Sequence, residues 1–229
     1  MHRLATTRVI VLLLWCLVVA MAAVAAPTPI PKPVKVWETG WDKPIDPVGD
    51  CRFDRNGDKL TITVPGKGHG WRDDDRELNA PRLLRNIEGD FTLEVRVKGN
   101  FDQPSGIRTA GIVLLAGTNE ATMYFSPWLF ISSLVRPGRS HSHTSFRTNK
   151  TECVYLRLQR RDQRLLMKTS LDGKVWDSAL DEEGYLDLPR KLSVGVVASA
   201  TAEGKFEAVF DQFVLTVLSP RQGQPPHTK

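Results

Sequence analysis

Apolar residues at every second position are the feature that most constrains the fold of this chain. Leu60, Ile62 and Val64 alternate with threonines. A period of two places apolar side chains on one face of a strand and polar side chains on the other. The same alternation recurs in the runs 91–98, 154–159, 194–198 and 206–210. We therefore predict a series of half-buried strands, each with one face in the core and one face toward water.

Two departures from this alternation are also informative. The run from Ile112 to Ala116 is apolar throughout, which predicts a central strand covered on both faces. The phase slips between Phe210 and Phe213, which predicts a β-bulge. Turn residues separate the runs, and no stretch keeps a helical apolar period for ten residues. Many short strands with frequent turns predict an all-β protein, either a sandwich or a jelly roll. The turn signals are Asn56-Gly57, Pro65-Gly66, Pro104-Ser105-Gly106, Pro137-Gly138 and Asp172-Gly173.

The first residues have the pattern of a secretory signal peptide. A basic start with Arg3 and Arg8 is followed by an apolar run over 9–19 and by small residues at Ala23 and Ala25. The apolar run is shorter than a membrane span requires. We therefore expect residues 1–25 to be removed and the protein to be secreted or periplasmic, with no membrane span after cleavage.

The remaining chain divides by composition. Residues 26–33 contain four alternating prolines and predict an extended linker. Residues 34–218 form the predicted domain, and the proline-rich residues 219–229 predict a disordered tail. Charge is mixed, with 31 Lys and Arg against 26 Asp and Glu, a net +5. This balance, without basic residues interleaved with aromatics, argues against nucleic acid as a partner.

Two cysteines lie in the predicted domain, Cys51 and Cys153. In an oxidising compartment they could form one disulfide across a long loop. The other interpretation is two buried free thiols. The sequence leaves both open.

Several motifs together resemble a known family. They are Asp46-Pro47-Val48-Gly49-Asp50-Cys51, Asn79-Ala80-Pro81-Arg82, Ser170-Leu171-Asp172-Gly173-Lys174-Val175-Trp176 and Phe210-Asp211-Gln212-Phe213. In this combination the chain resembles a bacterial domain-of-unknown-function family of the concanavalin A-like lectin/glucanase superfamily, over about residues 37–218. The resemblance implies a jelly-roll sandwich whose relatives include sugar binders, glucanases and accessory domains of glycosidases. It implies no reaction, and it leaves a structural calcium ion open.

Aromatic residues with polar neighbours are the candidates for ligand binding. Sugars stack their apolar ring faces on Trp or Tyr, while polar groups hydrogen-bond the hydroxyls, as in other small-ligand sites. The alternative is that these aromatics belong to the core or its rim. For the Asn79 to Arg82 segment, the alternatives are a loop that presents both polar side chains and a corner that is merely fixed by pairing with Asp or Glu. The candidate residues are His69, Trp71, Asn79, Arg82, Tyr124 and Trp128.

Evidence for catalysis is weak in the sequence. Glycoside hydrolysis needs two carboxylates at a defined separation, and the Glu-x-Asp-x-Glu strand of the superfamily's glucanases is missing. The nearest segment is Glu88-Gly89-Asp90, which is better interpreted as a turn before a strand. We therefore predict no catalytic residues and an exported binding module, with carbohydrate as the ligand class. The alternatives are a glycoside hydrolase with an acidic pair not located here and a cell-envelope protein-interaction domain.

No metal site is predicted. His141 and His143 are two apart, but two histidines do not complete a zinc site, and their serine-rich surroundings favour a solvated loop. The segment Asp54 to Asp58 lacks the glutamate of a calcium loop and is better explained by an Asn-Gly hairpin turn. The segment Ser170 to Trp176 is interpreted as a tight hairpin whose aspartate caps backbone amides. No cofactor is expected.

Overall fold

The computed structural model describes residues 43–71, 78–101, 106–117, 119–126, 129–136, 139–146, 152–180 and 188–218. Within these ranges the chain forms strands and no helix. The described residues therefore contain no helix long and apolar enough to cross a membrane. The expected signal peptide, linker and tail lie outside the described residues. The strands are β1 (Arg52–Asn56), β2 (Lys59–Val64), β3 (Arg82–Glu88), β4 (Phe91–Gly99), β5 (Arg108–Ala116), β6 (Asn119–Ser126), β7 (Leu129–Arg136), β8 (Arg139–Phe146), β9 (Cys153–Arg161), β10 (Arg164–Ser170), β11 (Asp177–Leu180), β12 (Lys191–Ala200) and β13 (Phe206–Val217).

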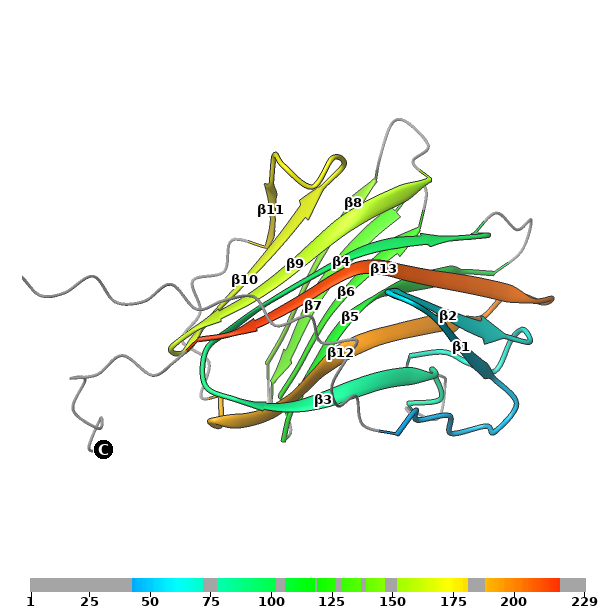
Figure 1. Ribbon diagram of the computed structural model, residues 1–229, viewed down its shortest axis with the longest axis horizontal. Helices are drawn as coiled ribbons and strands as arrows, with labels where there is room; N and C mark the ends of the chain where they lie inside the picture. Colours follow the sequence, from blue (N-terminus) through cyan, green and yellow to red (C-terminus); the bar gives the residue numbers. More distant parts are fainter. Residues whose placement is uncertain are drawn as a thin grey trace, which may run out of the picture. The chain divides into compact units, whose positions relative to one another are not determined.

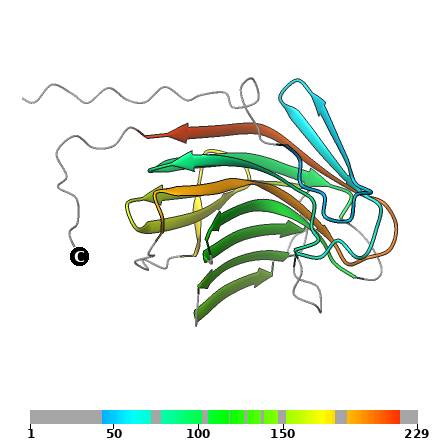
Figure 2. The ribbon, with the colours of Figure 1, turned by 90° about the horizontal axis from the view of Figure 1, so that it is seen from below.

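The strands form two antiparallel sheets that pack face to face (Figures 1 and 2). One has seven strands in the order β1-β2-β13-β4-β9-β10-β11, and the other has six in the order β3-β12-β5-β6-β7-β8. The predicted all-β sandwich is therefore confirmed. Strands far apart in the sequence are neighbours in space, since β12 lies between β3 and β5 and β13 lies between β2 and β4.

The core lies between the two sheets and follows the predicted alternation. On β4, Phe91, Leu93, Val95 and Val97 are fully buried while the residues between them are half-buried. Burial of such side chains contributes about 1.5–3 kcal/mol each in transfer free energy. Strand β5 is buried on both faces, as its continuous apolar run predicts.

The predicted bulge lies in β13. The register between β13 and β4 shifts between Asp211 and Val214, and Gln212 has a φ of 49°. Asp211 beside the bulge accepts two hydrogen bonds from Arg96 of β4, at 2.5 and 2.7 Å. Asp211 and Arg96 thus form the last regular pair before the bulge, on the outward face that the alternation of β13 gives them.

The hairpin over residues 170–176 has the predicted turn chemistry. Oδ1 of Asp172 accepts the backbone N–H groups of Lys174 and Val175 at 2.8 and 2.9 Å, and Gly173 has a φ of 74°. Trp176 at its end stacks under the guanidinium of Arg157, whose Cζ lies 3.7 Å from the ring centroid. The motif therefore has a structural role on the seven-stranded sheet.

The two cysteines do not form a disulfide. Both Cys51 and Cys153 are free thiols. Cys51 directly precedes β1 and Cys153 begins β9, and β2, β13 and β4 lie between these strands. Four strand spacings amount to roughly 19 Å, whereas the Cα atoms of a disulfide lie within about 7 Å. The disulfide alternative is therefore wrong for this fold.

Candidate functional site

The six-stranded sheet carries a second apolar cluster on the face turned away from the core, which we call the outer face. Alternate residues of β5 and β12 point into the core, so the residues between them belong to the outer face. Partly buried side chains from other segments pack against this cluster, among them Ile45 and Trp71. The buried members of the cluster are Ala80, Leu84, Val113, Tyr124 and Val197.

An aromatic pair forms one end of the outer face. The rings of Trp71 and Tyr124 meet edge to face, with centroids 6.0 Å apart and planes at 62°. Tyr124 is buried and lies opposite Gly111 of β5. The backbone N–H of Trp71 donates to Oγ of Ser199 on β12 at 3.2 Å. The structure thus brings together two of the predicted ligand residues, with the partly exposed Trp71 outermost.

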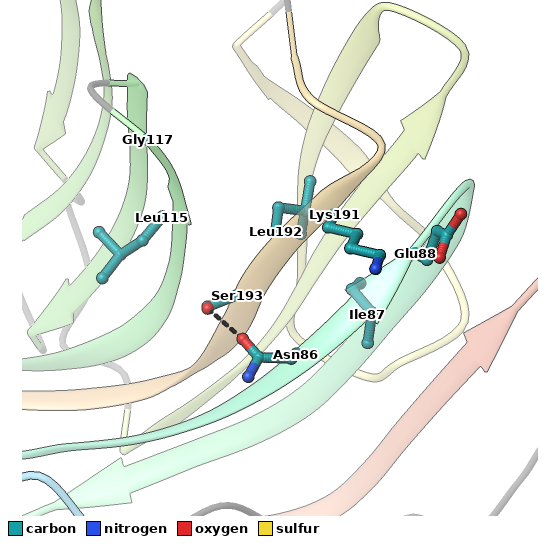
Figure 3. Close-up of a pocket in the computed structure, with 8 residues that line it drawn as sticks. All are labelled: Asn86, Ile87, Glu88, Leu115, Gly117, Lys191, Leu192 and Ser193. Carbon is teal, nitrogen blue, oxygen red and sulfur yellow. Dashed lines mark hydrogen bonds between the residues drawn. The ribbon is translucent and has the colours of Figure 1, made fainter.

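A shallow pocket of about 570 Å³ forms the other end of the outer face (Figure 3). Its walls come from β3, β5 and β12. The hydroxyl of Ser193 donates to Oδ1 of Asn86 at 2.6 Å, and Glu88 forms an ion pair with Arg190 at 3.3 Å. Leu115 belongs both to the pocket and to the apolar cluster, so the two ends are continuous. The lining residues are Asn86, Ile87, Glu88, Leu115, Gly117, Lys191, Leu192 and Ser193.

Sequence reasoning missed the polar residues of this pocket. Asn86 and Glu88 alternate with the core residue Ile87, and Lys191 and Ser193 alternate with the core residue Leu192. The alternation therefore contained the signal that these side chains face outward. The pairing of β3 with β12, which brings them together, has no local signature in the sequence.

Arg82 and Asn79 lie at the edge of the outer face, at a corner of the chain. Nη1 of Arg82 donates to the carbonyl groups of Leu78 and Ala80, both at 3.0 Å, and its backbone pairs with Ile45. The guanidinium therefore stabilises the corner, which favours the structural alternative for Arg82. Asn79 is half-buried next to this corner.

His69 is placed differently from its predicted role. Its side chain is 3% exposed, Nδ1 lies 2.8 Å from the carbonyl oxygen of Gly66, and Nε2 lies 2.7 Å from Oδ1 of Asp50. Burial alone would lower the pKa of His69, but the hydrogen bonds of its ring to Asp50 and to the carbonyl oxygen of Gly66 outweigh burial and raise the pKa above its ordinary value. Because the ring is buried and engaged on both sides, the geometry favours a structural role for His69 over the predicted role as a polar partner of a glycan.

A cluster of three metal-ligating residue types surrounds this histidine. Donor atoms of Asp50, Cys51 and His69 all lie within 4.8 Å of one another. Burial, followed by the negative charges of Asp46 and Asp50, raises the pKa of the Cys51 thiol well above its ordinary value. The sequence prediction of no metal site did not consider this cluster, whose histidine is distant in sequence from the adjacent Asp50 and Cys51.

Among the other residues considered in the sequence, Glu88 lines the pocket. Trp128 lies outside the described residues. His141 and His143 occupy alternate positions on β8, so the prediction of a loop there is wrong. Their side chains are not described. The carboxylate of Asp90 accepts the backbone N–H of Asp162 at 2.8 Å, while Glu88 pairs with Arg190. Glu88 and Asp90 thus each have a separate partner, in line with their interpretation as turn residues.

Two stacked antiparallel sheets in this arrangement define a jelly-roll protein of the concanavalin A-like type. The chain belongs to the family described as "Protein of unknown function (DUF1349)", which matches residues 50–217. The predicted resemblance to a domain-of-unknown-function family is therefore confirmed. No curated protein matches the chain in sequence.

Solved structures share the fold at low sequence identity. A functionally unknown protein from Saccharomyces cerevisiae is 19% identical, with a TM-score of 0.62, and the match covers 78% of this chain and 97% of that one. The GH43 BlXynB protein from Bacillus licheniformis is 14% identical, with a TM-score of 0.53 over 72% of this chain and 38% of that one. A family 7 alginate lyase solved with its substrate is 12% identical, with a TM-score of 0.51, and the match covers 74% of this chain and 83% of that one. The matched region thus spans well under half of the GH43 protein.

Proposed function

We propose that this protein is an exported module that binds a polysaccharide on the outer face of its six-stranded sheet. The observation that carries the proposal is the continuity of the outer face, which joins the aromatic pair at Trp71 to the polar pocket at Ser193 through Leu115. An elongated surface with an aromatic residue at one end and hydroxyl and amide groups at the other suits a chain of sugar units.

The aromatic end supplies the apolar contact. Trp71 is partly exposed and rests edge-on against the buried Tyr124, which limits the orientations of its ring. A ring held in place loses little conformational entropy when a ligand stacks on it. Trp71 is therefore the residue on which a sugar ring would pack, and Tyr124 is its support.

The pocket supplies the hydrogen bonds. Asn86, Lys191 and Ser193 offer amide, ammonium and hydroxyl groups at a surface open to solvent. Such groups bind sugar hydroxyls, and the ammonium adds a preference for a carboxylated sugar. The shared fold with a family 7 alginate lyase solved with its substrate supports an acidic polysaccharide as the first ligand class to test.

The test is affinity electrophoresis in gels that contain alginate, xylan or a β-glucan, followed by a glycan array. We expect retardation by at least one polysaccharide, and we expect Trp71→Ala to weaken binding by about tenfold or more, which corresponds to 1.4 kcal/mol. Lys191→Ala should weaken the binding of acidic polysaccharides more than that of neutral ones.

Trp176→Ala is the matched control, because Trp176 is also partly exposed but stacks on Arg157 of the other sheet. This variant should bind as the unmodified protein does. Absence of binding to every polysaccharide tested, or equal losses in the Trp71 and Trp176 variants, would refute the proposal. Release of reducing sugar during incubation would instead favour the glycoside hydrolase alternative.

A further inference from the structure

We propose that Asp50, Cys51 and His69 form a binding site for a divalent transition-metal ion, and that zinc is the ion their donor atoms suit best. The three residues offer a carboxylate oxygen, a sulfur and an imidazole nitrogen within 4.8 Å of one another. This proposal is independent of the polysaccharide site, and no part of it requires a sugar to bind.

The donor set selects the class of metal. Zinc accepts thiolate, imidazole and carboxylate ligands at about 2.0–2.3 Å, usually in a tetrahedron. Calcium and magnesium prefer oxygen ligands throughout, so the sulfur and the nitrogen of this cluster argue against them. Three ligands from the protein leave a fourth position, which a water molecule can take from the side of the exposed Asp50.

Two of the separations between donor atoms can be compared with those of a filled site. Ligands of one tetrahedral zinc ion lie roughly 3.3–3.8 Å apart, as follows from the bond lengths. Sγ of Cys51 already lies 3.6 Å from Oδ1 of Asp50. Nε2 of His69 lies 2.7 Å from the same oxygen, so the carboxylate and the ring must separate by about 1 Å to admit the ion. Asp50 is exposed, which allows its side chain to move.

The histidine is oriented as a metal ligand would be. Nδ1 of His69 is directed to the carbonyl oxygen of Gly66 at 2.8 Å, which leaves Nε2 facing Asp50 and Cys51. Metal-ligating histidines almost always donate their other ring N–H to a carbonyl or a carboxylate in this way. The backbone of His69 is also paired with Ala200 of β12 in both directions, so the ring is held on the sheet.

The segment that carries the other two ligands is fixed as well. The carboxylate of Asp46 accepts the backbone N–H groups of Gly49 and Cys51, at 2.9 and 2.7 Å. These bonds close a turn that holds Cys51 against the edge of the core. Asp46 also adds negative charge near the thiol, which favours a cation in the cluster.

Binding of the metal ion releases two protons from the site. The Cys51 thiol loses its proton and becomes a thiolate ligand, and the proton shared between His69 and Asp50 leaves so that Nε2 can donate its lone pair to the metal. Both protons pass to solvent. No oxidant or reductant is needed, because zinc does not change its oxidation state.

The experiment adds Co²⁺ and then Zn²⁺ to the metal-free full chain under reducing conditions. Co²⁺ should give a thiolate-to-cobalt charge-transfer band in the near ultraviolet, with one ion bound per chain. Excess Zn²⁺ should abolish the band and raise the melting temperature, because a ligand that binds only the native state stabilises it.

Variants test the assignment of the ligands. Cys51→Ser should eliminate the charge-transfer band and weaken Zn²⁺ binding by at least about tenfold, within the range seen when interactions at metal sites are removed. Cys153→Ser is the matched control, since Cys153 is also a half-buried free thiol but begins β9. This variant should retain the charge-transfer band and the affinity for Zn²⁺.

A second variant covers the case in which Cys51→Ser does not fold. Asp50→Asn changes an exposed side chain, keeps its size and should also weaken Zn²⁺ binding. The proposal is overturned if no band appears in the unmodified protein, if Cys51→Ser or Asp50→Asn binds Zn²⁺ as tightly as the parent, or if Cys153→Ser loses the band.

Discussion

At the scale of single residues, Arg160 departs from its sequence pattern. Val154, Leu156 and Leu158 face the core of the sandwich, and Arg160 continues the same face of β9. It is 3% exposed, and its guanidinium donates to the carbonyl groups of Asp162, Leu188 and Pro189 at 2.7–3.2 Å. A buried charge is tolerated there because backbone oxygens replace its hydration.

Asp211 provides a prediction about pH and stability. Partial burial would raise the pKa of Asp211, but hydrogen bonds from Arg96 and Lys98 outweigh it and hold the pKa below its ordinary value. A carboxylate whose pKa is lowered by folding stabilises the native state above its unfolded pKa, and this contribution disappears as the pH falls through the folded pKa. We expect Asp211→Asn to cost about 1–3 kcal/mol at pH 7.

The measurement is urea denaturation of parent and variant from pH 7 to pH 2. The difference in unfolding free energy should stay constant down to about pH 4 and shrink below it. Asp54→Asn is the control, because Asp54 pairs with Arg52 at 2.7 Å on an exposed surface and should change stability by less than about 1 kcal/mol. A difference for Asp211 that grows toward low pH would contradict the assignment.

At the scale of strands, the close pairing of β12 with β3 positions the outer face. Gly195 lies opposite Leu84, and a Cβ atom added to Gly195 would lie far inside the contact distance of the Leu83 carbonyl oxygen. The same pairing brings Ser193 to Asn86 at the pocket. The absence of a side chain at Gly195 is therefore a condition for the pocket.

Gly195→Ala should separate the two strands and destabilise the protein by several kcal/mol, since backbone atoms must shift to remove the clash. Gly57→Ala is the comparison, because Gly57 has a φ of 60° and nothing within 4 Å of an added Cβ, so only its backbone conformation is penalised, by about 1–2 kcal/mol. Thermal unfolding of both variants distinguishes the two costs. A loss in Gly195→Ala no larger than in Gly57→Ala would show that the strands are not packed so closely.

At the scale of the whole domain, the strand order keeps the cysteines apart. We expect Cys51 and Cys153 both to react with a thiol reagent after denaturation without reductant, because three strands separate β1 from β9. Peptide mass spectrometry of the labelled protein checks this for each cysteine. A peptide pair linked through Cys51 and Cys153 would contradict the strand order described here.

Only part of the site could be predicted. Trp71 and Tyr124 are visible in the sequence as aromatics near polar residues, and they meet in the structure. Asn86 and Ser193 are ordinary polar residues of alternating strands and become neighbours only through the pairing of β3 with β12. His69 has the residue type of a ligand contact, but its burial against Asp50 depends on how its loop docks on β12.

The sequence by itself determined the strand segments that alternation or a continuous apolar run marks, together with their two faces, the bulge near Gln212 and the sandwich class. A period of two shows which side of a strand is apolar, and this needs no distant partner. Only the tertiary structure decided which strands are neighbours, how far apart Cys51 and Cys153 lie, and that Asp50, Cys51 and His69 meet. Strand pairing between distant segments depends on the packing of the whole domain, and the local pattern is compatible with many pairings.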